Sequence, residues 1–134
     1  MNINGIVSDV KFETLITDEV KAEMKKKVAE IKAANPKIKR VYPIVIEGDT
    51  EAGEKPFYIG YFKNPDLKTF SLFMASGQQD QVTAMYNLAK NLLVGGDKEV
   101  CDDDDLFLRG VMPTLSEITA ARNTKIVNLS TAGE

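Results

Sequence analysis

The sequence contains no histidine and only one cysteine, Cys101. Without histidine, Ser-His-Asp and Cys-His catalytic arrangements are impossible, and the most common metal ligand is missing. One cysteine cannot form an internal disulfide and is too few for a structural zinc site. These absences favour a protein that is not an enzyme, and we expect neither a metal nor another cofactor.

The sequence also lacks any run that approaches the ~20 apolar residues of a membrane-spanning helix, so we expect no membrane partner. Residues 1–6 lack the basic and apolar regions of a signal peptide, and the single cysteine favours a reducing compartment. We therefore expect a protein of the cytoplasm. Its 134 residues suit one domain, 1–134, with a frayed tail from about residue 127.

Charge is unevenly distributed along the chain, whose net charge is −3. Residues 20–40 are rich in lysine, whereas acidic residues outnumber basic ones from residue 64 onward. Nucleic-acid recognition favours arginine and interleaved aromatic side chains, which the basic stretch lacks, so we expect no nucleic-acid partner. The asymmetry is compatible with solvated helix surfaces, with self-contact or with a charged partner.

Two short patterns suggest ligand sites but have the wrong spacing. Asp102–Asp105 are consecutive, whereas a calcium loop spaces its acids at alternate positions, so this run indicates a helix N-terminus. Gly95–Asp97 lacks the Gly-Lys-Ser/Thr ending of a phosphate loop and follows a helical pattern. It predicts the turn that ends that helix.

The clearest structural signal is a junction between a strand and a helix. Phe57–Lys63 is rich in aromatic and β-branched residues, which predicts a strand. Asn64 then suits a helix N-cap, Pro65 the first helical position, and Asp66 the positive end of the helix dipole. The chain is therefore expected to change from strand to helix at once.

Flanking segments complete the predicted fold. Residues 38–47 form a second strand pattern, and Pro43 favours an edge position because it lacks a backbone N–H. Thr17 is expected to open a helix before the hairpin. After the junction, Gly77 and then Asp80 separate successive helical patterns. The class is α+β: a small, mostly antiparallel sheet (hairpin about 38–63), preceded by one amphipathic helix and followed by three or four packed helices.

Alternation along the second strand predicts which side chains share a face. One face holds Phe57, Ile59 and Tyr61, and the other holds Tyr58, Gly60 and Phe62. One face is expected to pack on helices, while the other is either covered as well or exposed, and an exposed apolar face marks an interaction site.

We predict a partner-binding surface made of strand aromatics, apolar residues of the following helix and lysines of the first helix. Its members are Phe57, Tyr58, Tyr61, Phe62, Leu67, Phe70, Met74, Lys25, Lys26 and Lys27. Replacing Phe62 or Phe70 by Asp is expected to abolish association without unfolding the protein.

Short motifs spread over residues 38–118 show a family resemblance. They are Tyr58–Lys63 followed by Pro65, and Gly95–Asp97 followed by Asp102–Leu108. Together they resemble the small tail assembly chaperones of phage and prophage tail modules. The resemblance implies a β-hairpin before a helical half, self-association and no catalytic residues. It also implies binding of the long, apolar tape-measure protein in the cytoplasm of the host bacterium.

Two other functions remain open. A structural subunit of the phage particle (capsid, connector or tail component) would also bind other virion proteins, but it would be present in the finished virion. A small-ligand binder or an enzyme would need a deep pocket with converging polar groups.

Overall fold

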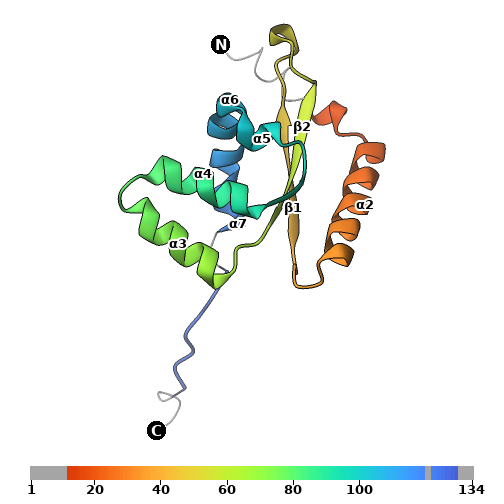
Figure 1. Cartoon of the computed structure of the whole chain (residues 1–134). Coiled ribbons are helices and arrows are strands. Elements are labelled where there is room, and N and C mark those ends of the chain that lie inside the picture. Colours follow the sequence, from red (N-terminus) through yellow and green to blue (C-terminus); the bar gives the residue numbers. More distant parts are fainter. Residues whose placement is uncertain (1–11, 120–121, 130–134) are drawn as a thin grey trace.

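The computed structural model describes residues 12–119 and 122–129, and the predicted α+β class is confirmed. A three-stranded antiparallel sheet has the strand order β1-β2-β3, with one long helix before it in the chain and several shorter helices after it (Figure 1). The elements are α2 (Asp18–Ala34), β1 (Val41–Glu47), η1 (Thr50–Ala52), β2 (Phe57–Lys63), α3 (Leu67–Gly77), α4 (Gln81–Leu92), β3 (Leu93–Gly96), α5 (Glu99–Asp102), α6 (Asp104–Leu106), the π-helical segment η2 (Phe107–Val111) and α7 (Met112–Ile118).

The predicted hairpin is formed by β1 and β2, which pair from Val41 opposite Lys63 to Glu47 opposite Phe57. β1 is at an edge of the sheet, and Pro43 is exposed on it, as its missing N–H led us to expect. The hairpin is therefore specified by the sequence itself, through strand composition and one proline.

Helix starts follow the predicted caps in two cases and differ in one. Thr17 Oγ1 accepts the N–H of Val20 at 3.2 Å, and Asp80 caps α4 in the same way. The predicted N-cap at Asn64 is wrong. Asp66 caps α3 instead, because Asn64 still pairs with Arg40: its N–H donates to the Arg40 carbonyl and its Oδ1 accepts the Arg40 N–H. β2 ends at Lys63 as expected, but Asn64 still pairs with Arg40 beyond the strand, so the helix begins only at Leu67.

The interpretation of Gly95 and Gly96 as a helix-ending turn is wrong. α4 does end, at Leu92, but the chain continues directly as β3, where Gly96 lies opposite Gly60 of β2. Glycine is required at position 96, because its φ is +88° and a Cβ would lie 2.3 Å from the Ile59 carbonyl oxygen. The two glycines therefore allow a strand to dock where a larger residue would clash.

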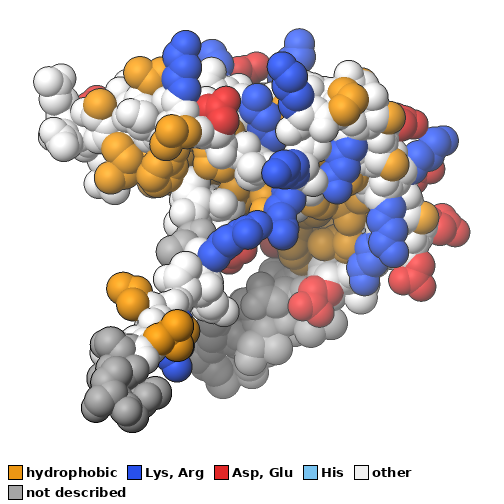
Figure 2. Space-filling model, turned by 90° about the horizontal axis from the view of Figure 1, so that it is seen from below, with side chains coloured by type: hydrophobic (Ala, Val, Ile, Leu, Met, Phe, Trp, Pro, Cys, Tyr) orange, Lys and Arg blue, Asp and Glu red, His pale blue; other side chains and the backbone are white. Residues whose placement is uncertain are grey.

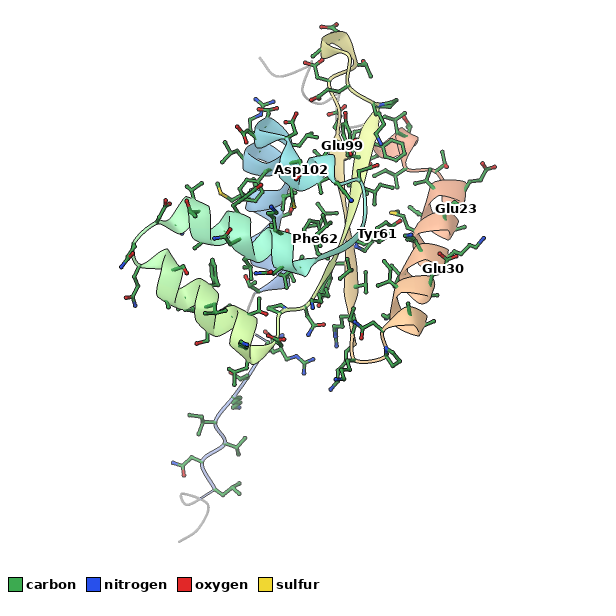
Figure 3. All side chains as sticks on the ribbon, in the orientation of Figure 1. Glu23, Glu30, Tyr61, Phe62, Glu99 and Asp102 are labelled. Carbon is green, nitrogen blue, oxygen red and sulfur yellow. The ribbon has the colours of Figure 1, made fainter. Side chains whose placement is uncertain are left out.

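Helices cover both faces of the sheet (Figure 1). The main core lies between the sheet and the later helices, where the buried residues are Ile44, Tyr58, Phe62, Leu88, Ala89, Leu92, Val100, Cys101, Leu106, Phe107, Val111 and Leu115. α2 packs on the opposite face with a half-buried stripe that includes Val20 and Met24, and none of its residues is buried. Figure 3 shows Tyr61 pointing toward α2 and Phe62 pointing toward the later helices.

Within residues 12–119 and 122–129, none of the helices combines the length and apolarity that a membrane crossing requires.

Candidate partner-binding surface

The aromatic residues of β2 lie inside the protein. Phe62 is 0% exposed, Tyr58 7% and Tyr61 6%, while Phe57 is half-buried. Burial raises the pKa of the Tyr61 hydroxyl, and the carboxylates of Asp97 and Glu23 raise it further. The expectation that Phe62→Asp leaves the fold intact is therefore wrong, because the charge would be placed in the core.

The predicted residues of α3, in contrast, lie at the surface. Leu67 is 87% exposed and Met74 56%, while Phe70 is half-buried and its ring centroid lies 5.9 Å from that of Phe73. Leu67, Phe70 and Met74 follow one another at helical spacing, so they share one face of α3. This face exposes large apolar side chains that a partner could cover.

The predicted lysines occupy a different part of the molecule. Lys25, Lys26 and Lys27 are exposed on α2, which lies across the sheet from α3 (Figure 1). The structure therefore divides the predicted surface into three parts: an exposed face on α3, an exposed basic stretch on α2, and aromatic side chains buried between them.

A groove of about 480 Å³ adjoins the α3 face. We call it the junction groove, since the strand–helix junction forms one wall. Its apolar lining is Tyr42, Pro65, Leu67, Phe70 and Ile118, and its charged lining is Lys39, Arg40, Asp66, Glu117 and Arg122. Figure 2 shows this side of the molecule from below, with apolar side chains exposed among Lys and Arg side chains. The groove can therefore accept an apolar segment, with more cationic than anionic groups around it.

A second groove lies between α2 and β2. Val20 and Met24 of α2 and Phe57 and Ile59 of β2 are among its apolar lining residues, and its volume is about 640 Å³. It exists because α2 packs loosely, with no fully buried side chain. Phe57, predicted as a contact residue, faces this second groove and not the junction groove.

The Gly-Gly-Asp motif has a structural role. The Asp97 carboxylate accepts the N–H of Ile59 at 2.9 Å, and its other oxygen lies 2.7 Å from Nζ of Lys55. The hydrogen bond between the Lys55 and Asp97 side chains is the largest effect on the pKa of Lys55, and it raises that pKa. Because the Lys55 side chain is half exposed, we expect the ion pair to add less than about 1 kcal/mol. The motif ties the hairpin loop to β3.

The acidic run is also used locally. Asp103 caps α6 by accepting the N–H of Leu106 at 3.0 Å, and Oδ1 of Asp105 lies 3.1 Å from Nε of Arg109. No group of three potential metal ligands is found within the part of the chain that the structure describes. The interpretation of this run as a helix N-terminus is confirmed at Asp103.

The Cys101 thiol is buried, and burial raises its pKa from 9.0 to about 11, with a smaller contribution from the Asp102 carboxylate. We expect the native protein at pH 8 to react with a thiol reagent about a hundredfold more slowly than the unfolded chain, because the reactive thiolate is scarcer. Reagent absorbance measured with and without denaturant tests this. Equal rates in the two states would contradict it.

Sequence reasoning missed the contribution of α7 and the segment after it. Ile118 and Arg122 line the junction groove, although they lie more than fifty residues from Pro65 along the chain. Residues 122–129 then run away from the helices without forming a helix or strand (Figure 1).

Comparison of the chain with protein-family models, with curated proteins and with solved structures finds no match.

Proposed function

We propose that this protein acts by binding other phage proteins, as a tail assembly chaperone that holds the apolar tape-measure protein. The observation that carries the proposal is the exposed apolar face of α3. Leu67 is 87% exposed and Met74 56%, Phe70 between them is half-buried, and the junction groove adjoins this face. Large apolar side chains gathered on one helix cost free energy in water and mark a surface that a partner covers.

The groove also suits such a partner chemically. Its lining includes apolar side chains against which a hydrophobic segment can pack, and Lys39, Arg40 and Arg122, which also line it, can pair with acidic residues of the bound chain. The motifs of residues 38–118 that resemble tail assembly chaperones support the same function. The absence of histidine is in keeping with a role that involves no reaction.

Co-expression with the tape-measure protein of the same phage tests the proposal. We expect Leu67→Asp to lower the amount of tape-measure protein that stays soluble and co-purifies by about tenfold, because it places a charge in the apolar contact. Val82→Asp is the matched control. Val82 is also exposed, at 50%, but it lines a different groove, with Tyr86 and Leu108.

Two results would contradict the proposal. One is unchanged recovery of the tape-measure protein with Leu67→Asp, when circular dichroism shows that the variant is folded. The other is detection of the protein by mass spectrometry in purified, finished particles, which would favour a structural subunit of the virion.

A further inference from the structure

Residues 122–129, which we call the C-terminal arm, expose large apolar side chains. Ile126 is 96% exposed, Val127 65% and Leu129 76%. The arm forms neither helix nor strand and runs away from the helices (Figure 1), and at ~3.3 Å per residue it can span up to about 25 Å. A segment with these side chains is expected to be covered in the functional state.

The arm begins at the edge of the junction groove. Ile118, Thr119 and Arg122 line the groove, and the chain then leaves it toward Leu129. Two uncovered apolar features therefore meet at one place. One is the junction groove with the adjacent α3 face, which no described residue covers. The other is the C-terminal arm, whose apolar side chains pack in no groove.

We propose that two copies of the chain exchange these arms, so that Ile126, Val127 and Leu129 of each copy pack in the junction groove and on the adjoining α3 face of the other. Because the arm starts at the groove, two copies related by a two-fold axis with their grooves facing each other bring each arm to the partner's groove. A two-fold contact of this kind is self-complementary and closed, so it yields a dimer and not a chain of molecules.

A second copy fits better than the arm's own groove. Ile126 lies four residues beyond Arg122, so the arm can place it up to about 13 Å past the groove's edge. To return, the chain would have to reverse at residues 123–125, where Asn123 is the sole residue of a type that favours turns. In the exchanged arrangement the arm keeps the course away from its own helices that it has in the structure (Figure 1).

Light scattering on the purified full-length protein tests the exchange. We expect a species of twice the 14.8 kDa chain mass, and we expect Ile126→Asp and Leu67→Asp each to raise the dimer dissociation constant by about tenfold or more. Val82→Asp on α4 is the matched control, expected to leave the dimer intact. A wild-type protein that stays monomeric at all concentrations would overturn the proposal, as would a dimer that Ile126→Asp does not weaken.

Disulfide trapping identifies which copy supplies the arm. Chains that carry Leu129→Cys are mixed with differently tagged chains that carry Leu67→Cys, and the native Cys101 is buried and does not interfere. A disulfide-linked heterodimer supports exchange. In a chain that carries both substitutions, a disulfide within one chain at high dilution would overturn it, because the arm would then occupy its own groove.

The exchanged arms and the tape-measure protein would compete for the same groove, so the exchange describes the protein before that partner binds, and it can fail separately from the chaperone function. If Leu67→Asp abolishes tape-measure binding while the oligomeric state stays unchanged, the exchange is wrong and the proposed function stands. If Ile126→Asp gives monomers and recovery of the tape-measure protein does not depend on Leu67, the exchange stands and the proposed function is wrong.

Discussion

Replacing Phe62 by Ala is expected to destabilise the protein by about 3–5 kcal/mol, the usual cost of truncating a fully buried aromatic side chain. Phe62 is 0% exposed and is the largest of the fully buried side chains. It lies in the core between β2, α4 and the later helices. Since small domains are stable by only about 5–15 kcal/mol, this loss removes a large share of the total. Urea unfolding followed by circular dichroism measures it.

Phe57→Ala is the matched control for this substitution. Phe57 belongs to the same strand and is the same residue type, but it is half-buried on the opposite face, toward α2. We expect a loss of about 1–2 kcal/mol, because less apolar surface leaves water when Phe57 folds into place. Equal losses for the two variants would mean that the face toward α2 is as well packed as the main core, which would contradict the structure.

Replacing Gly96 by Ala is expected to cost about 2–4 kcal/mol, since backbone strain and a steric clash act together. The φ of Gly96 is +88°, and a Cβ there would lie 2.3 Å from the Ile59 carbonyl oxygen. The same oxygen accepts the N–H of Asp97 at 2.8 Å, so a shift that relieves the clash would also weaken the attachment of β3 to β2. Chemical denaturation gives the free energy of unfolding.

Gly53→Ala separates strain from clash. Gly53 has a similar φ of +85°, but a Cβ there would meet nothing within 4 Å. We expect a loss of about 1 kcal/mol, the cost of placing a side chain in left-handed backbone. The difference between the two variants measures the clash at Ile59, and a Gly96→Ala variant no less stable than Gly53→Ala would argue against the observed docking of β3.

Some elements were predictable from local chemistry. The pairing of β1 with β2 follows from two strand-forming segments joined by a polar loop, and Pro43 marked the open edge. The caps at Thr17 and Asp80 follow from hydroxyl and carboxylate oxygens placed three residues before the N–H groups that they accept. These signals act over about one helical turn, so a single sequence is enough to read them.

Other elements depended on the neighbours of a segment. Gly95 and Gly96 have the composition of a helix end, and the strand that they form exists only because Ile59 and Gly60 offer backbone groups beside them. The candidate site was predicted in part. Leu67, Phe70 and Met74 were placed on one helix face by their spacing, whereas alternation along β2 could not show that both faces would be covered.

The hairpin of β1 and β2, the caps of α2 and α4 and the apolar face of α3 were thus contained in the chain's own pattern, because each depends on residues within about one turn or one strand. Tertiary packing decided that Phe62 became core and Leu67 became surface, and it brought Ile118 and Arg122 to the junction groove beside Pro65. The physical reason is that the burial of a side chain depends on contacts between segments that lie far apart in the chain. A side chain's apolarity shows that it gains from leaving water, but not which neighbour will exclude the water from it.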